Sequence, residues 1–212
     1  MTLRELEHLF KDLSVRKYSQ GQIILYPGDT LKFIYFIKHG YCKMYRKNDQ
    51  GDDRVYMLFQ PKTAFPVLPI GINRKSYLVK FYYQAMTNVE LYQLTREQFF
   101  QIIEKHIEAS TVVLRYMTEL YDDLIKRLAI IENKDAKSKI ANVFRYLINI
   151  SGEEVMTDVY RLHIKITHQD IASLAGLTRE TASINMKQLE ADKIIERKAG
   201  RHLIINASQL PE

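Results

Sequence analysis

Residues 167–190, THQDIASLAGLTRETASINMKQLE, predict two short helices joined by a sharp turn. Thr167 is a typical N-cap residue, and Asp170 three positions later completes a capping box. Gly176 supplies the turn, because glycine adopts positive φ without steric cost. Thr178 then caps a second helix. The spacing is that of a helix-turn-helix.

The second predicted helix has an apolar and a polar face. Ala182, Met186 and Leu189 recur at helical spacing, so we expect them to point inward. The polar face near the start of this helix carries Arg179, Glu180, Ser183 and Lys187. Apolar runs at 194–195 and 203–205 then flank the basic segment 197–201, which predicts a β-hairpin wing with a basic tip.

A further helix and hairpin are predicted before this motif. Apolar residues between Ile140 and Leu147 indicate the helix, which Ser151-Gly152 ends. The run 162–166 alternates apolar and polar residues, as one strand of a small hairpin does.

The first hundred residues predict an all-β domain that follows a short amphipathic helix over residues 3–13. Runs rich in β-branched and aromatic residues indicate strands at 23–25, 33–37, 41–46, 55–59, 77–86 and 89–94. Turn signals separate several of these runs, for example Pro27-Gly28-Asp29. Short strands at such spacing are typical of a barrel or sandwich, and a barrel of this size can hold a small ligand.

Thr95 opens a capped helix, with Gln98 three residues on as its capping-box partner. A long helix with a heptad pattern follows it. Apolar residues recur at spacings of three and four after His106 over more than three heptads. The predicted dimer seam is Leu114, Met117, Tyr121, Leu124, Leu128 and Ile131. The alternative is a helix that packs on its own barrel, but the strict heptad spacing favours pairing with a second copy. Polar residues from Glu132 to Lys137 then indicate a hinge.

Composition excludes several classes of protein. The single cysteine, Cys42, rules out an intrachain disulfide and is expected to be a buried, inert thiol. No apolar run approaches the roughly 20 residues of a membrane span, and no secretory signal is recognisable, so we expect a cytoplasmic protein. The net charge of +6 suggests an anionic partner but does not locate its site, because residues from Asp135 onward carry eleven basic and ten acidic side chains.

The stretch from Ile166 to Ile205 resembles the winged helix-turn-helix of the cyclic-AMP-receptor and Fnr (Crp/Fnr) family of bacterial transcription regulators. The residues that carry the resemblance are Thr167, Gln169-Asp170-Ile171-Ala172, Gly176, Thr178-Arg179-Glu180-Thr181, Ser183 and Leu189. The Pro27-Gly28-Asp29 turn, the segment 33–40 and the heptad helix resemble the same family's sensory module. The resemblance covers nearly the whole chain.

The resemblance implies an α+β fold in three parts. Residues 1–106 would form a sensory, cyclic-nucleotide-binding-like β-barrel (a double-stranded β-helix or jelly roll) with flanking helices. Residues 107–134 would form the dimerisation helix and hinge, and residues 135–212 the winged helix-turn-helix DNA-binding domain. The resemblance further implies a homodimer that regulates transcription from a palindromic double-stranded operator, with RNA polymerase as a partner if it is an activator.

The family places the second helix of the motif in the major groove, and the exposed side chains suit this. Arg179 can donate two hydrogen bonds to guanine O6 and N7, and Glu180 can accept one from cytosine N4. Ser183 is the third residue expected to read bases. The expected phosphate contacts are Thr167, Gln169, Thr178, Lys187, Lys198 and Arg201. Ile184 stands where family members commonly carry a second arginine, so we expect a different operator half-site.

The sensory module lacks the family's known ligand signatures. The Gly-Glu and Arg-Ser pairs of the cyclic-nucleotide binders align with Ala64-Phe65-Pro66-Val67 and Val79-Lys80, which argues against cyclic AMP. The cysteine cluster of the oxygen-sensing members is absent. Haem would need an axial histidine such as His8, His39 or His106, and we disfavour it. An unidentified small effector is expected, with Phe65, Lys80 and Tyr82 as candidate contacts, and no cofactor or metal ion is expected.

Three other functions compete with an effector-controlled regulator. The barrel could serve only as a dimerisation scaffold in an effector-independent DNA-binding regulator. An enzyme is disfavoured, because no catalytic triad, paired-carboxylate cleft, phosphate loop or metal-ligand spacing is recognisable in the sequence. A cyclic-nucleotide-binding module that anchors partners would leave the Arg179-Glu180 helix unexplained.

Overall fold

The chain forms two compact units in the computed structural model, which describes residues 10, 13–66, 77–133, 135–198 and 203–211. The first unit comprises Met1–Tyr45 and Met57–Asp123, and the second comprises Arg46–Tyr56 and Leu124–Glu212. The helix expected over residues 3–13 falls outside the described residues except for Phe10 and Leu13. Phe10 is buried in the core of the first unit.

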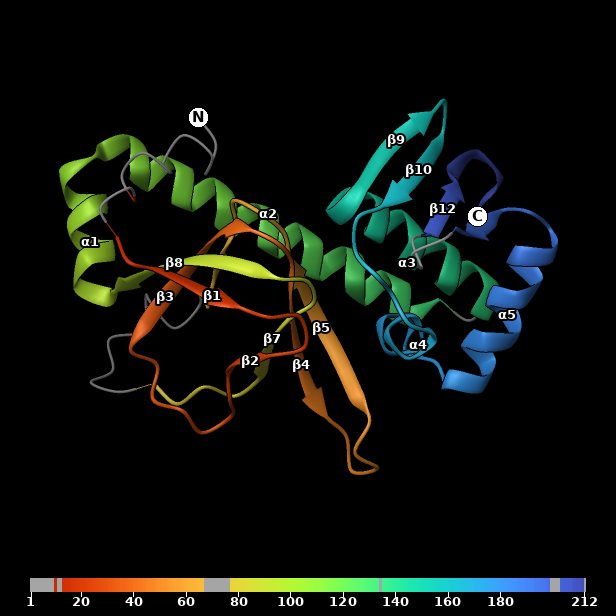
Figure 1. Cartoon of the computed structure of the whole chain (residues 1–212), viewed down its shortest axis with the longest axis horizontal. Coiled ribbons are helices and arrows are strands. Elements are labelled where there is room, and N and C mark those ends of the chain that lie inside the picture. The colour runs from red at the N-terminus through yellow and green to blue at the C-terminus, as the bar shows by residue number, and fades with distance from the viewer. Residues whose placement is uncertain (1–9, 11–12, 67–76, 134, 199–202, 212) are drawn as a thin grey trace. The chain divides into compact units, whose positions relative to one another are not determined.

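Two four-stranded sheets make up most of the first unit (Figure 1). One has the order β1-β8-β3-β6 and the other β2-β7-β4-β5, of which β4 and β5 belong to this unit only in part, because Arg46–Tyr56 is assigned to the second unit. The strands are β1 (Val15–Tyr18), β2 (Ile23–Leu25), β3 (Phe33–His39), β4 (Cys42–Lys47), β5 (Asp53–Phe59), β6 (Ala64–Phe65), β7 (Tyr82–Ala85) and β8 (Val89–Thr95). The predicted all-β class is confirmed, although the two sheets do not join into a closed barrel within the described residues.

Two short strands escaped the sequence prediction, and a third is shorter than expected. Strands β1 and β6 are too short to show alternation, and they are held by their neighbours β8 and β3. The strand expected over 77–86 is confined to Tyr82–Ala85, while Leu78 makes only an isolated bridge to Thr30. The composition of residues 77–86 indicates an extended chain but does not determine which of these residues pair with a neighbouring strand.

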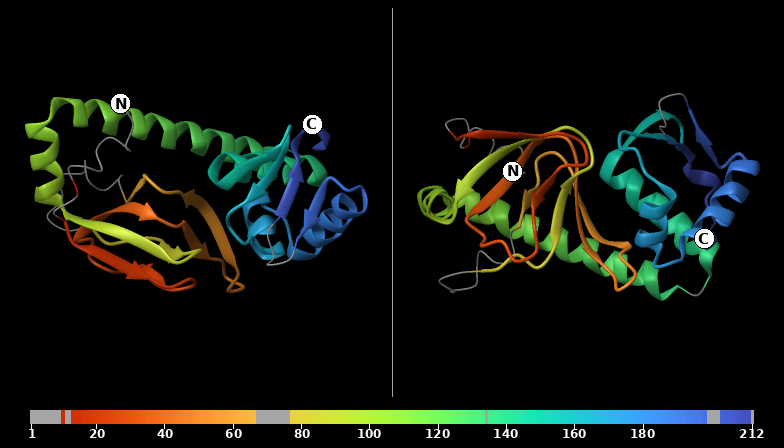
Figure 2. Two further views of the ribbon diagram at one scale, coloured as in Figure 1. Left: turned by 45° about the horizontal axis from the view of Figure 1, so that its top comes forward. Right: turned by 60° about the horizontal axis from the view of Figure 1, so that its bottom comes forward.

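Two helices cover the sheet that contains β3 and β8. Thr95 caps α1 (Arg96–Lys105) with the predicted capping box to Gln98, and α2 (Ile107–Glu132) follows. Ala109, Val112 and Tyr116 of α2 pack into one apolar core with side chains of the sheet. The Tyr116 hydroxyl donates to the Ala64 carbonyl at 2.7 Å and accepts from the Ala64 amide at 3.2 Å, so α2 binds the backbone of β6. Figure 2 shows these helices lying over the sheet.

The second unit contains the C-terminal part of α2 from Leu124, the helices α3 to α5, and a four-stranded sheet of order β11-β12-β10-β9. Its elements are α3 (Ala136–Ser151), β9 (Gly152–Met156), β10 (Val159–Leu162), α4 (His168–Ala175), α5 (Arg179–Ala191), β11 (Ile195–Arg197), β12 (Leu203–Asn206) and the 3-10 turn η3 (Ala207–Gln209). Asp135 caps α3, and Gly152 ends the helix where the sequence predicts. Ile140, Phe144 and Leu147 of α3 are fully buried.

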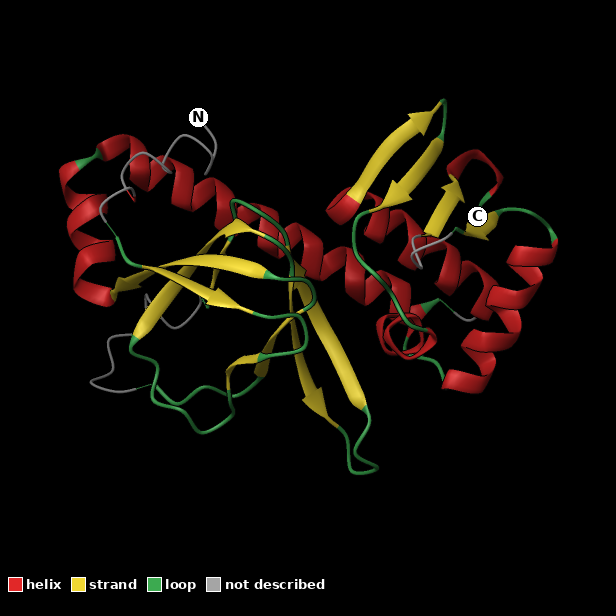
Figure 3. Cartoon of the chain, in the orientation of Figure 1, coloured by secondary structure: helices red, strands yellow, loops and turns green. Residues whose placement is uncertain are grey.

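The strand predicted over 162–166 is wrong beyond its first residue. β10 ends at Leu162, and a loop leads from there into α4 (Figure 3). Ile164 and Ile166 are nevertheless buried, so the alternation reflects a loop that packs every second side chain into the core. The hairpin itself pairs β10 with β9, which lies in a polar stretch that the hydrophobic pattern does not mark.

Candidate nucleic-acid interface

Helices α4 and α5 begin with the capping interactions that the sequence predicts. The Thr167 hydroxyl accepts from the Asp170 amide at 3.1 Å, and the Asp170 carboxylate accepts from the Thr167 amide at 3.0 Å. The Thr178 hydroxyl accepts from the Thr181 amide at 3.2 Å. These bonds satisfy backbone donors that a helix start would otherwise leave free, and they fix where each helix begins.

Gly176 makes the turn between the two helices. Its φ of 66° lies in the left-handed region, as predicted. Its amide donates back into the last turn of α4, and the Leu177 amide donates to the Ala172 carbonyl at 2.9 Å. This end of α4 therefore places Thr178 at the start of α5 after only a three-residue connection, Gly176 to Thr178.

Helix α5 has the two faces that the sequence predicts. Ala182, Met186 and Leu189 are fully buried. Arg179 and Glu180 are exposed in the first turn, with Ser183 half-buried one turn later. Ile184 is 69% exposed, which is unusual for a large apolar side chain and places it on the same accessible side of the helix. The predicted base-reading residues are therefore accessible on one helix.

The predicted phosphate contacts differ in how available their donors are. Lys187 and Lys198 are exposed, and Gln169 is half-buried. The Thr167 hydroxyl gives its only hydrogen to the Asp170 carboxylate at 2.6 Å, and the Thr178 hydroxyl lies 2.9 Å from that of Thr181. Both threonine hydroxyls thus already serve helix caps. Arg201 lies outside the described residues.

Strands β11 and β12 pair as the predicted wing and carry two exposed ion pairs. Arg197 Nε donates to Glu190 Oε1 at 3.0 Å, which joins the wing to α5. Lys198 Nζ contacts Glu196 Oε1 at 2.7 Å. Exposed pairs of this kind contribute little stability, about 0–1 kcal/mol, so both cations can exchange a carboxylate for a phosphate.

Sequence reasoning missed Arg127, the one side chain with a formal charge that is buried within the described residues. Its guanidinium donates to the Leu174 carbonyl at the end of α4 and to the Val55 carbonyl at 3.3 Å, both in the second unit. It also lies over the Tyr146 ring, 5.5 Å from the centroid. Burial lowers the pKa of Arg127. Helical spacing could have indicated its burial, because Arg127 follows the buried Tyr116 by about three turns and so lies on the same face of α2.

The predicted dimer seam is exposed at its heptad positions. Leu114, Tyr121 and Leu128, seven residues apart, are 70%, 66% and 55% exposed. Ile131 is also exposed, whereas Met117 packs against the first unit's core and Leu124 is half-buried. Helix α2 therefore carries two apolar faces, one packed on its own sheet and one open to a partner.

The three candidate effector contacts do not share one space. Phe65 is fully buried, stacked on Tyr83 with ring centroids 5.1 Å apart. Tyr82 lies on the opposite face of β7 from Tyr83 and stacks on Tyr45 at 5.0 Å. Lys80 is exposed. Phe65 and Tyr83, together with Tyr35 and Phe59, form an aromatic cluster between the two sheets.

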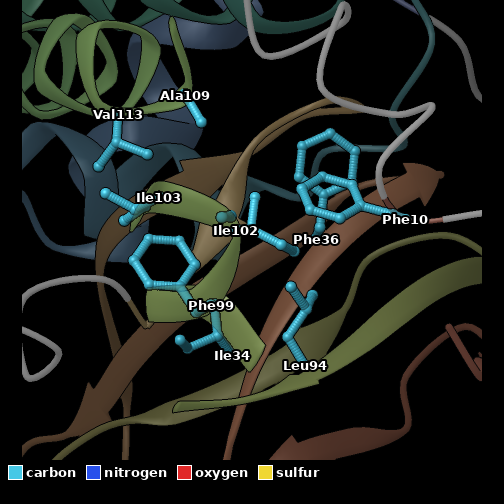
Figure 4. Close-up of a pocket in the computed structure, with 10 residues that line it drawn as sticks. Phe10, Ile34, Phe36, Leu94, Phe99, Ile102, Ile103, Ala109 and Val113 are labelled. Carbon is cyan, nitrogen blue, oxygen red and sulfur yellow. The ribbon is translucent and has the colours of Figure 1, made fainter. Parts of the chain in front are cut away.

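Described residues of the first unit line an apolar cavity and an open hollow. One is an apolar cavity of about 20 Å³ between α1, α2 and the sheet, lined by Phe10, Phe36, Phe99 and their neighbours (Figure 4). That volume is about one water molecule, and the lining offers no polar partner to hold one. The other is an open hollow of about 410 Å³ between β2 and β3, where Asp29, Thr30 and Lys32 line the wall.

The remaining sensor candidates have surface or core positions. His39 and His106 are exposed, and His8 lies outside the described residues. Cys42 is fully buried, and burial raises the pKa of its thiol. The described ranges contain no cluster of His, Cys, Asp or Glu that could hold a metal ion. In the same ranges, no helix is both long and apolar enough to cross a membrane.

Comparison with known proteins agrees with this architecture. Residues 15–106 match the model of the cyclic nucleotide-binding domain, and residues 140–211 match that of the Crp-like helix-turn-helix domain. The chain is 26% identical over 182 residues to the global nitrogen regulator of Nostoc sp. strain PCC 7120, covering 85% of this chain and 80% of the relative. It is 25% identical over 190 residues to the HTH-type transcriptional regulator ArcR of Staphylococcus epidermidis strain RP62A, covering 90% and 81%.

A solved structure shares the fold over the full length. The structure of a CooA mutant from Carboxydothermus hydrogenoformans superposes with a TM-score of 0.76 at 18% identity, covering 99% of this chain and 94% of that one. A cyclic-nucleotide-binding-type domain followed by a Crp-like helix-turn-helix defines a DNA-binding transcription regulator, not an enzyme. The chain belongs to the Crp/Fnr family.

Proposed function

We propose that this regulator acts as a homodimer on a palindromic operator in double-stranded DNA, with α5 in the major groove. The observation that carries the proposal is the division of α5 into a buried face and an accessible one that begins with Arg179 and Glu180. A guanidinium at the start of a recognition helix suits guanine, and a carboxylate beside it suits cytosine. A two-fold protein requires a two-fold site.

The partner in this dimer is a second copy of the chain, paired along α2. Leu114, Tyr121 and Leu128 recur every seven residues and leave more than half of each side chain in water. Heptad-spaced apolar side chains of this kind are typical of a coiled-coil contact. We assign residues 1–106 to the sensory domain, 107–134 to the dimerisation helix and hinge, and 135–212 to the DNA-binding domain. Action on chromosomal DNA would place the protein in the cytoplasm, with RNA polymerase as a further partner if it activates.

The effector we propose is a small molecule other than cyclic AMP. At the positions aligned with the family's phosphate-binding pair stand Val79, which is buried, and Lys80, which is exposed. A buried valine offers no hydrogen bond to a phosphate. The hollow beside Asp29 and Lys32 has the volume of a small-ligand site and is open to solvent.

An effector-independent regulator is the second candidate function, and one observation favours it. The space between the two sheets is occupied by the stacked rings of Tyr35, Phe59, Phe65 and Tyr83. The enclosed cavity between α1, α2 and the sheet has a volume of only about 20 Å³. Enclosed ligand sites usually measure roughly 300–1,000 Å³. In this case the sensory domain would act as a scaffold for dimerisation.

Selection of binding sites from random duplex DNA tests these proposals. The purified full chain is used at a fixed salt concentration, without ligand and with added cyclic AMP. We expect an inverted repeat, unchanged by cyclic AMP, from the wild type and from Arg161→Ala, which removes an exposed arginine of β10. Enrichment only with cyclic AMP contradicts the proposed effector class. An asymmetric site contradicts the two-fold dimer, and enrichment of the same site by Arg179→Ala contradicts the assigned reading helix.

A further inference from the structure

One hydrogen bond joins the two helices of the motif through a side chain expected to read bases. His168 Nδ1, on the first residue of α4, lies 2.9 Å from Ser183 Oγ on α5. Both side chains are half-buried. The bond holds the Ser183 hydroxyl in a fixed direction, and a hydroxyl that shares its single hydrogen with a neighbour has less freedom toward a base.

The state of the imidazole decides what Ser183 can offer. If Nδ1 carries no hydrogen, Ser183 donates its hydrogen to His168 and keeps lone pairs that can accept from a base. If Nδ1 carries a hydrogen, Ser183 accepts from His168 and its own hydrogen is free for a base acceptor. A neutral ring can adopt either tautomer, whereas an imidazolium is a donor at both nitrogens.

The charged groups around His168 come from α5 and β11. Burial and the positive charges of Arg197, Arg179 and Lys187 lower the pKa of His168 below its ordinary value of 6.5, and Glu190 acts in the opposite direction. Glu190 is itself paired with Arg197. On α4, the Asp170 carboxylate accepts the Thr167 hydroxyl. The ring is therefore mainly neutral near pH 8, and the pH at which it becomes half charged lies below the ordinary pKa of 6.5.

We propose that His168 is a positioning residue that sets whether Ser183 acts as a hydrogen-bond donor or acceptor at one base of the operator. The proposal rests on the proposed reading of DNA by α5. With the neutral ring, Ser183 can serve guanine, whose major-groove edge only accepts, or cytosine, whose edge only donates. With the charged ring, His168 cannot take the Ser183 hydrogen, which is then free for guanine, so protonation favours guanine relative to cytosine at that position. Operator choice at one base pair thus depends on pH.

The test measures operator affinity by fluorescence anisotropy with the full chain at constant salt. The position read by Ser183 is first identified as the one whose base preference is lost in Ser183→Ala. Duplexes with guanine or cytosine there are then compared at pH 8.0 and about pH 5.5. We expect the ratio of the cytosine Kd to the guanine Kd to rise at the lower pH, by up to about tenfold, because one base contact contributes roughly 1–3 kcal/mol.

Variants separate this effect from a general gain of charge. His168→Gln can still donate or accept but does not titrate, so its ratio should stay constant with pH. His163→Gln removes an exposed histidine of the same unit and should keep the wild-type response. Tighter binding of both duplexes at low pH with an unchanged ratio overturns the proposal, as does an equal change of ratio in His168→Gln.

Two further outcomes also decide the question. If Ser183→Ala alters no single position while the operator is still selected, the inference fails and DNA binding stands. If no operator is selected at either pH, the proposed function and the inference fail together. Circular dichroism of each variant at both pH values shows whether a lost response reflects lost folding.

Discussion

At the scale of single residues, the side chains proposed to contact DNA would act in two ways, and their positions distinguish the two. Arg179 and Glu180 are exposed at the start of the helix, where base edges are reached first. Lys198 is exposed next to the wing. The planar guanidinium of Arg179 can donate two hydrogen bonds to one base, whereas the flexible ammonium of Lys198 contributes positive charge near the DNA phosphates.

Replacing Arg179 with alanine should relax specificity at one guanine of each half-site. The loss should amount to about 1–3 kcal/mol of discrimination, because a bidentate contact to O6 and N7 disappears. Anisotropy titrations against operators carrying each base at that position measure it. Equal discrimination by the variant and the wild type would show that another residue reads this base.

Replacing Lys198 with alanine should weaken binding to all duplexes alike. One lost phosphate contact should reduce the steepness of log K against log salt by about 1. Titrations at several salt concentrations on the operator and on a scrambled duplex measure this slope. Glu196→Ala is the matched control, because it removes the exposed partner of Lys198 and should not weaken binding. A loss confined to the operator would instead assign base readout to Lys198.

Sequence could predict which residues of α5 are exposed but not what they contact. The period of Ala182, Met186 and Leu189 determines the buried face, and exposure of the others follows. The bond from His168 to Ser183 joins side chains fifteen residues apart and depends on how α4 crosses α5. The capping box, by contrast, predicts that the Thr167 hydroxyl binds within its own cap. The same hydroxyl was also expected to bind phosphate, although its hydrogen is already given to Asp170.

At the scale of elements, helices were easier to predict than strands. Caps such as Thr95 with Gln98 and Thr167 with Asp170 are local signals, and both form. Strand β6 has two residues and exists because Ala64 and Phe65 pair with β3 and Tyr116 binds Ala64. Arg127 likewise gains its role from carbonyls distant in sequence, which its helical spacing from Tyr116 does not identify.

The turn at Gly176 gives a prediction for stability. Alanine there should lower the free energy of unfolding by about 1–2 kcal/mol, because φ stays positive in the folded chain. A methyl group would meet Ile131 only at 3.6 Å, so the cost is conformational and not steric. Urea denaturation measures it, and Gly176→Asn should lose less, since asparagine tolerates this conformation. An equal loss in both variants would point to crowding instead.

At the scale of the whole molecule, the two faces of α2 connect folding with assembly. The face with Ala109, Val112 and Tyr116 completes the core of the first unit. The heptad face with Leu114, Tyr121 and Leu128 is left open. Sequence period alone could not divide these residues between the two faces, because Met117 fits the heptad and also packs on the core.

Replacing Tyr121 with aspartate should yield a folded monomer. The side chain is 66% exposed, so the monomer core is unaffected, while a carboxylate in a paired seam would be buried without a partner. Light scattering measures the mass, and Ala129→Asp places the same charge at another exposed position of α2 as the control. A dimer that survives Tyr121→Asp would move the interface elsewhere.

The burial of Cys42 offers a way to detect transient opening of the first unit. A chain with one thiol, enclosed in the first unit and with a raised pKa, should react with a thiol reagent only in molecules where that unit opens. The rate of labelling would then measure openings of the first unit without any engineered residue. A second cysteine introduced at an exposed position would be modified first, so dyes could be attached to the native protein site by site.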